Sequence, residues 1–395
     1  MSNVPMTLPD LAISIQARPF SHTSTFVELE DGRIIHCSHR VREWSDDGGL
    51  TWSETWEDHQ FMKDTHGDPV GGAETSLVKL SGRNEIGLTA RITVEGRPTG
   101  ATYAAPPRWG KFVFWRSTDG GETWQPPVDI TAPNLSTAGL QDTFLRTSSG
   151  RIVLPVIQML GQQTGPGNRA IPINGRLVAN QFAGTAGHYY DCGFCCNYVC
   201  YSDDDGRTWN MNKDGALIIL HDWNDHFSKS TEASVTEVAP GRLLMFMRNV
   251  LGRVFQAWSN DNGETWTRPQ PTVLSAPTTP AQIRTLGNGH LLCVWNQASE
   301  EEIRSGVNRT RLSSAISRDG GRVWEFFQNI ESLYETTRVE PGPIRPVRPE
   351  EIYFPSGQPA VERDACFVGA TDDSFSLPTV TCDSAIRPSW CCPTA

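Results

Sequence analysis

The chain has 395 residues, of which 38% are hydrophobic and 20% are charged, a composition that is ordinary for a folded globular protein. Its formal net charge of −11 argues against nucleic acid as the main partner. No apolar run approaches the roughly 18 residues that a membrane-spanning helix needs, so we also expect no membrane partner.

Pairs of short apolar segments joined by a glycine turn recur along the chain, which is rich in glycine (35) and proline (27). The turns are Asp31-Gly32-Arg33, Ser81-Gly82-Arg83, Ser149-Gly150-Arg151, Pro240-Gly241-Arg242 and Asn288-Gly289-His290. Apolar runs closed by Gly, Asp or Asn predict strands and tight turns, whereas segments with helical periodicity are scarce. The sequence therefore predicts an all-β protein.

An eight-residue pattern, Ser-x-Asp-x-Gly-x-Thr-Trp, follows each glycine turn. Its five copies begin at Ser45, Ser117, Ser202, Ser259 and Ser317, and the last has Val323 in place of Thr. In a hairpin turn the Asp carboxylate can accept backbone N–H groups, the Gly can adopt a positive φ, and the Trp begins the returning strand. We call this pattern the Asp repeat and interpret each copy as a turn.

One unit therefore reads strand, glycine turn, strand, variable loop, strand, Asp repeat, strand. Four antiparallel strands repeated radially predict a β-propeller, with 1–395 as one domain. The expected blades cover roughly 18–60, 70–130, 138–215, 228–272, 278–330 and 350–390. The last has no Asp repeat, and we expect N-terminal residues to help close it. The prediction is thus a six-bladed propeller with Asp repeats in five blades.

The alternation of turns assigns the two faces of this propeller. Glycine turns and Asp repeats share one face, which we call the bottom, and the loops between second and third strands share the other, the top. The long insertions all extend the top. Long loops on one face of a rigid scaffold predict a binding site there, so the Asp-repeat carboxylates are interpreted as turn residues distant from any chemistry.

The Asp repeats resemble the Asp boxes (BNR repeats) of the sialidase, or neuraminidase, superfamily, and the whole chain resembles its six-bladed propellers. Such repeats also occur in exo-arabinanases, photosystem assembly factors and non-catalytic modules. The resemblance therefore identifies the fold better than the activity, and the activity has to be argued from residues of the top face.

The resemblance is most specific over residues 232–248. Glu232 begins one expected strand and Arg248 ends the next, at the positions where sialidases have a glutamate and an arginine. It implies that Glu232 polarises a tyrosine nucleophile and that Arg248 binds the substrate carboxylate. Arg311 resembles the next arginine of the family, with Arg309 as a competitor, and Tyr353 stands where the tyrosine is expected.

These residue types suit an acidic sugar. A sialic acid carries a carboxylate on its anomeric carbon, which would repel an Asp or Glu nucleophile but not a tyrosine activated by a neighbouring Glu. Guanidinium groups bind carboxylates in a bidentate manner and stay charged. The alternative interpretation is that Glu232 and Arg248 form a surface salt bridge and that Tyr353 packs between blades.

The first expected blade departs from the family pattern. Sialidases have an arginine where this chain has His22, and the short following loop contains His39. The general acid is then expected from the connection to the second blade, where Asp68 stands near Asp64 and His66. The histidines that could share this sector are His22, His36, His39 and His66. Such a group would also suit a polysaccharide lyase, in which His or Tyr removes a proton from a uronate.

Other polar residues of the top face could hydrogen-bond sugar hydroxyls or equally be solvated loop residues. They are Glu74 and Arg91 in the second blade, Gln141 and Asp142 in the third, and Asn296 in the fifth. The function predicted first is a sialidase-like exo-glycosidase that releases a terminal acidic sugar from a glycan or oligosaccharide, without a cofactor. The alternatives are a uronate-directed propeller lyase and a non-catalytic carbohydrate-binding propeller.

The cysteines were the only candidates for a metal site. Cys192, Cys195, Cys196 and Cys200 form a cluster near His188 and Asp191 that could hold zinc. Free or partly paired cysteines are favoured, because Cys200 falls on an apolar strand pattern and no second pair has a standard spacing. Residues 1–15 show no secretory signal, so we expect a reducing, cytoplasmic environment and no metal.

Overall fold

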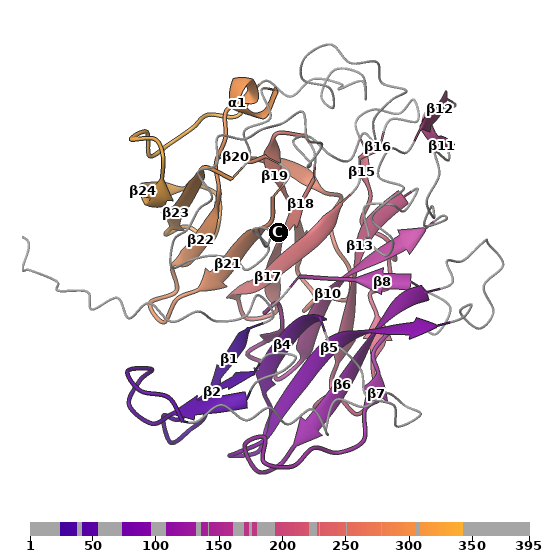
Figure 1. The fold of residues 1–395 in the computed structure, drawn as a ribbon, viewed down its shortest axis with the longest axis vertical. Helices are drawn as coiled ribbons and strands as arrows, with labels where there is room; N and C mark the ends of the chain where they lie inside the picture. The colour runs from indigo at the N-terminus through magenta and orange to yellow at the C-terminus, as the bar shows by residue number, and fades with distance from the viewer. Residues whose placement is uncertain are drawn as a thin grey trace, which may run out of the picture.

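The computed structural model describes residues 24–37, 42–53, 73–95, 108–131, 136–140, 142–160, 170–173, 176–179, 194–220, 227–228, 230–249, 251–277, 279–304 and 309–342. Strands dominate these residues, and their one helix is α1 (Glu300–Arg304). Within the described part of the chain, no helix has the length and apolar character that crossing a membrane requires. The prediction of an all-β propeller is confirmed (Figure 1).

Five antiparallel sheets follow one another along the chain as blades. The first contains β1 (Thr25–Glu28), β2 (Ile34–Cys37) and β3 (Arg42–Ser45), in that order. The second contains β4 (Ala73–Lys79), β5 (Ile86–Glu95), β6 (Arg108–Ser117) and β7 (Val128–Asp129). In the third, the innermost position is divided between β8 (Ser136–Ala138) and β9 (Leu145–Arg146), which both pair with β10 (Ile152–Leu160); β13 (Phe194–Ser202) and β14 (Asn210–Met211) complete it.

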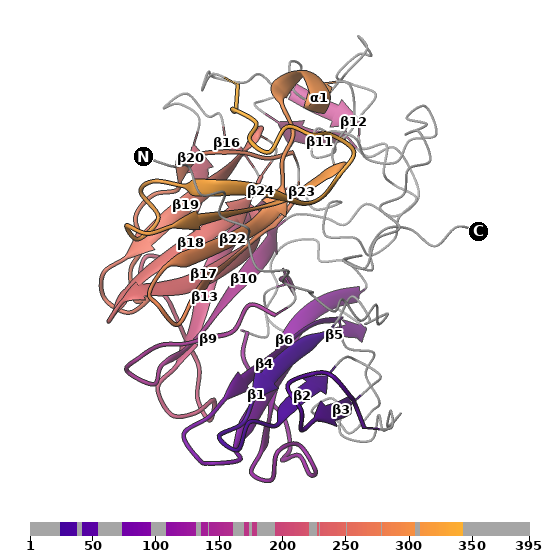
Figure 2. The same ribbon diagram turned by 90° about the vertical axis from the view of Figure 1, so that its left-hand side faces the viewer.

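The fourth and fifth blades are regular four-stranded sheets. The fourth contains β17 (Thr231–Ala239), β18 (Arg242–Arg248), β19 (Arg253–Ser259) and β20 (Gln270–Ser275). The fifth contains β21 (Ala281–Thr285), β22 (Leu291–Asn296), β23 (Arg311–Ser317) and β24 (Glu325–Ser332). Two hairpins, β11 (Ala170–Ile173) with β12 (Arg176–Ala179) and β15 (Ile219–Leu220) with β16 (Phe227–Ser228), lie in the loops. Figure 2 shows α1 and β12 at the same end of the molecule. Residues 350–390, expected to form a sixth blade, lie outside the described part.

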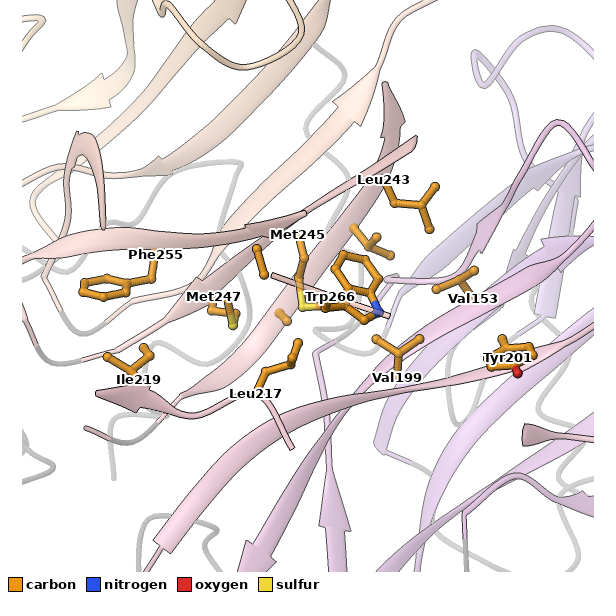
Figure 3. Packing of buried hydrophobic residues seen from close by; sticks show 13 residues of the cluster. Val153, Val199, Tyr201, Leu217, Ile219, Leu243, Met245, Met247, Phe255 and Trp266 are labelled. Atoms are coloured by element: carbon orange, nitrogen blue, oxygen red, sulfur yellow. The ribbon is translucent and has the colours of Figure 1, made fainter. Parts of the chain in front are cut away.

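The core is divided into four clusters, one between each pair of neighbouring blades. Strand β18 explains the pattern, because its sequence Leu-Leu-Met-Phe-Met is apolar on both faces. Leu243, Met245 and Met247 face the third blade (Figure 3), whereas Leu244 and Phe246 face the fifth. A strand buried on both sides needs a continuous apolar run, and each such side chain contributes about 2 kcal/mol of hydrophobic stabilisation.

Each Asp repeat forms a hydrogen-bonded turn. The Ser hydroxyl donates to the Asp carboxylate at 2.7 to 2.9 Å and accepts the N–H of the Gly at the fifth position of the pattern. That Gly has a positive φ in all five turns, for example 91° at Gly49. A residue with a Cβ would be strained there, so glycine fixes the shape of the turn. The repeats are therefore part of the scaffold.

Candidate functional site

Glu232 and Arg248 lie together at the top of the fourth blade. The cross-strand partners Thr231 and Arg248 place the start of β17 beside the end of β18, at the opposite end from the turn at Gly241. The register shifts between Thr231 and Ser234, which marks a β-bulge, and Glu232 within it has a φ of 24°. A bulge changes the direction of a side chain, and positive φ is costly for a residue other than glycine. The backbone is thus strained at the predicted site.

The two side chains form a buried ion pair. Arg248 Nη1 donates to Glu232 Oε2 at 2.5 Å, and the residues are only 5% and 7% exposed. The alternative interpretation of a surface salt bridge therefore does not describe this contact. Burying either charge alone would be costly, so each stabilises the other in its buried position.

Arg311 begins β23 as expected, but its described contacts are all within the fifth blade. Its Nη1 and Nη2 donate to the two carboxylate oxygens of Glu302 at 3.2 and 3.1 Å, and Nη1 also donates to the Gln297 carbonyl. The guanidinium carbon lies 4.6 Å from the centre of the Tyr334 ring. Arg311 is 3% exposed, and both of its Nη atoms donate to Glu302. Its predicted binding role stays a prediction.

Glu302 is a site residue that the sequence interpretation missed, although a signal was present. Ser299 Oγ accepts the N–H of Glu302, and Glu302 Oε2 accepts the N–H of Ser299. This reciprocal pair is a capping box, recognisable in sequence as Ser followed three residues later by Glu. This capping box begins α1 and orients the Glu302 carboxylate toward Arg311.

Asp142 lies where several blades meet, rather than on an isolated loop. Its Oδ1 accepts a 2.7 Å hydrogen bond from Thr25 Oγ1 in β1, and its N–H donates to Thr75 of β4. Arg284 in β21 donates to the Asp142 carbonyl and to its Oδ2, the latter at 3.3 Å. Asp142 has a φ of 52°, a conformation that Asp tolerates better than most residues. It links strands across the propeller axis, and its role toward sugar hydroxyls stays a prediction.

The second-blade candidates lie near the junction with the third blade. Arg91 Nε donates to the Thr137 carbonyl of β8 at 2.8 Å. Gly110 permits this approach, since a Cβ there would lie 2.3 Å from Arg91 Nε. Glu74 is part of β4, but its side chain is outside the described part. No described contact brings Arg91 to Glu232 or Arg248.

Several predicted site residues lie outside the described ranges: Tyr353, Asp68, His22 and His39. Of the histidines in the first blade, His36 is described and is buried. Its Nδ1 lies 2.8 Å from Glu43 Oε1, and its ring stacks on Phe26 at 4.8 Å between centroids. His36 therefore packs against its own blade.

The cysteine cluster is described in part. Cys196 and Cys200 are free and buried, and burial raises the pKa of each thiol to about 12. A protonated thiol is a poor metal ligand. Within the described ranges, no group of three or more His, Cys, Asp or Glu side chains could hold a metal ion.

Comparison with known proteins places this geometry in a family context. The family described as BNR repeat-like domain matches residues 104–356, which is more than half of the chain. A sialidase of Bacteroides fragilis (strain YCH46) is 26% identical over 299 residues, covering 71% of this chain and 47% of that protein. The chain thus spans about half the length of this relative.

Two solved structures share the fold. A protein described as Hadza microbial sialidase Hz136 has a TM-score of 0.53 at 19% identity, covering 76% of this chain and 57% of that one. A protein of unknown function from Dyadobacter fermentans DSM 18053 has a TM-score of 0.50 at 17% identity, covering 77% and 81%. At these identities the likeness supports the propeller fold alone.

Proposed function

We propose that this chain, which belongs to the BNR repeat-like domain family, is a sialidase-type exo-glycosidase that hydrolyses a terminal acidic sugar from a glycan. The observation that carries the proposal is the buried Glu232–Arg248 pair at the top ends of β17 and β18. A relative named sialidase supports the same reaction class.

In this proposal Arg248 binds the sugar carboxylate. A guanidinium has five N–H donors in a planar fork, a geometry that matches the two oxygens of a carboxylate. Arg309, two residues before Arg311, is the alternative second arginine, because the described Arg311 nitrogens already contact Glu302. Burial of the pair strengthens its interaction with an anion by excluding water.

The proposed chemistry proceeds in two displacements. Glu232 takes the phenolic proton as the Tyr353 oxygen attacks the anomeric carbon, and the glycosidic C–O bond breaks while Asp68, or His22, protonates the leaving oxygen. Water then attacks the anomeric carbon as it gives a proton to the same Asp68 or His22, and the released tyrosine oxygen takes its proton back from Glu232. The net reaction is hydrolysis with retained configuration.

We also propose that residues 350–390, with N-terminal residues helping to close the ring, supply the sixth blade, which carries Tyr353. Burial alternates along β22 and β23, so that one face of the fifth blade leaves apolar side chains half-exposed. Leu292 pairs with Ile316 on that face, and Val294 and Leu312 lie on it as well. A neighbouring blade would bury this surface as the fifth blade buries the fourth.

The test is release of the fluorophore from a fluorogenic α-sialoside. We expect Arg248→Lys to lower kcat/KM by about 10- to 100-fold, mostly through KM, because a point charge cannot reproduce the guanidinium fork. Arg242→Lys is the matched control, since Arg242 begins the same strand at the bottom, where it stacks on Trp258, and should leave kcat/KM within about twofold.

Three outcomes separate the candidate functions. Sugar release by the wild type that is lost in Arg248→Lys supports the proposal. Formation of an unsaturated, ultraviolet-absorbing uronate from a uronate-containing glycan would show the lyase instead. Binding of an acidic glycan that depends on Arg248, with no cleavage across a broad glycan panel, would show a non-catalytic propeller.

A further inference from the structure

Asn197 is a buried side chain of the third blade that bonds to the start of the fourth. It lies in β13 and is 0% exposed. Its Nδ2 donates to Ser230 Oγ at 2.5 Å and to the Thr231 carbonyl at 3.2 Å. Both acceptors immediately precede Glu232, so one amide crosses the blade interface to the backbone that positions the candidate catalytic glutamate.

The bond to Thr231 has a direct consequence for Glu232. The Thr231 carbonyl belongs to the peptide unit that joins the two residues, and the orientation of that unit sets the φ of Glu232. That φ is 24°, inside a β-bulge, where relaxation to a common conformation would be favourable. A fixed carbonyl therefore fixes the direction in which the Glu232 side chain leaves the backbone.

The bond to Ser230 extends toward Arg248. Ser230 Oγ in turn lies 3.6 Å from the sulfur of Met247, the residue before Arg248. Met247 packs in the cluster between the third and fourth blades, which also contains Leu217 and Ile219 (Figure 3). The Asn197 backbone is itself held, because Leu217 N–H donates to its carbonyl at 2.6 Å. The amide is thus held by the third blade, bonds directly to the start of the fourth, and is linked to β18 through Ser230 and Met247.

Packing alone does not explain an asparagine at this buried position between the third and fourth blades. Its Oδ1 is buried and has no hydrogen-bond partner among the described residues, which is costly compared with an apolar side chain of similar volume. Asn197 therefore contributes two directional hydrogen bonds, which it donates to Ser230 and Thr231.

We propose that Asn197 is a positioning residue that holds Glu232 in its strained conformation and so aligns the Glu232–Arg248 pair. The role of Asn197 in catalysis rests on the proposed sialidase function. Its effect on the geometry of the Glu232–Arg248 pair is independent of that function. Preorganisation of this kind matters because a displacement of about 1 Å at a reacting group can cost about 100-fold in rate.

The kinetic test compares Asn197→Ala with Asn212→Ala. Asn212 is a matched control, being a buried asparagine of the same blade whose side chain bonds to Val199, Asp214 and Gly215 rather than to the fourth blade. On a fluorogenic α-sialoside, Asn197→Ala should lower kcat by about 10- to 100-fold with little change in KM and flatten the acidic limb of the pH profile. Asn212→Ala should lower the melting temperature without either change.

A structural test separates failure of this inference from failure of the proposed function. In a crystal structure of Asn197→Ala we expect Glu232 to adopt a negative φ and its carboxylate to leave Arg248. If the strained φ and the ion pair persist, the inference is wrong, even if the wild type cleaves sialosides. If Asn197→Ala does not fold, Ser230→Ala, which removes one acceptor, should give a smaller change in the same direction, and unaltered geometry there would overturn the inference. If the wild type cleaves no sialoside, the proposed sialidase function is refuted. The structural comparison of the wild type with Asn197→Ala still tests the positioning role.

Discussion

Two buried arginines on the top face have different surroundings. Arg248 pairs with Glu232 across two strands of the fourth blade, whereas Arg311 contacts both oxygens of Glu302, a carbonyl and an aromatic ring. Bidentate contacts fix orientation as well as charge. Arg311 therefore holds α1 on the fifth blade, a role that needs no substrate.

We predict that Glu302→Gln lowers the free energy of unfolding by about 2 kcal/mol at neutral pH, because it replaces a charged bidentate acceptor while keeping the shape. Glu301→Gln is the control, since Glu301 is exposed in the same helical turn. Burial, the largest single influence, would raise the pKa of Glu302, but the hydrogen bonds from Arg311 and Ser299 and the charge of Arg311 together outweigh burial and lower the pKa. Its stabilisation is therefore present above about pH 4 and lost as the pH falls through the lowered folded pKa.

Urea denaturation at pH 7 and at about pH 3 measures this effect. The difference between wild type and Glu302→Gln should shrink in acid, whereas Glu301→Gln should match the wild type throughout. An equal difference at both pH values would contradict a role for the Glu302 charge.

At the scale of the element, the Asp repeats behave as small acid-sensitive turns. In the first, hydrogen bonds from the hydroxyl and N–H of Thr51 are the main cause that lowers the pKa of Asp47 to about 2. Four turns have this Thr hydroxyl bond, at 2.5 to 2.7 Å. The fifth has Val323, which offers only its N–H to Asp319, at 2.9 Å. The fifth turn is thus a natural variant that lacks one bond.

Val323→Thr should restore that bond. Val323 is 54% exposed, so the change removes little buried apolar surface, and we expect a gain of about 0.5 kcal/mol at neutral pH. The new donor would lower the folded pKa of Asp319 further, so the gain should be present above about pH 4 and disappear as Asp319 becomes protonated in acid. Val323→Ser, which adds the hydroxyl without the methyl, serves as the comparison. Melting curves at neutral pH and in acid measure this gain in stability. A gain that remains when Asp319 is protonated would refute the mechanism.

The elements were predictable from sequence to the extent that local chemistry determines them. Glycine turns and Asp repeats specify tight turns, and the apolar run in β18 specifies a strand buried on both faces. The adjacency of Glu232 and Arg248 also followed, because both residues flank one hairpin. Contacts between blades did not follow, because the bond from Asn197 to Thr231 depends on how two sheets pack. The Arg311–Glu302 pair was missed because the capping box preceding α1 went unrecognised.

At the scale of the whole molecule, the blades are joined through the axis as well as through their faces. Thr25 of the first blade accepts a hydrogen bond from the Leu77 N–H of the second and donates to Asp142 in the third. Asp142 accepts from Arg284 of the fifth, whose Nη1 also contacts Ser234 Oγ of the fourth at 3.2 Å. One hydrogen-bonded chain therefore connects all five described blades and resists their separation.

A double-mutant cycle tests this axial chain. Thr25→Val keeps the volume but removes the hydroxyl from a fully buried position, so it should lower the free energy of unfolding by about 2 kcal/mol. Combined with Arg284→Met, its effect should deviate from additivity by about 1 kcal/mol, because Asp142 couples the two residues. Thr89→Val is the control, since the Thr89 hydroxyl donates to the Val113 carbonyl within the second blade alone, and it should add to Arg284→Met within about 0.5 kcal/mol. Urea denaturation measures both cycles. Equal additivity in both pairs would mean that the apolar faces hold the blades together and that the axial hydrogen bonds do not couple them.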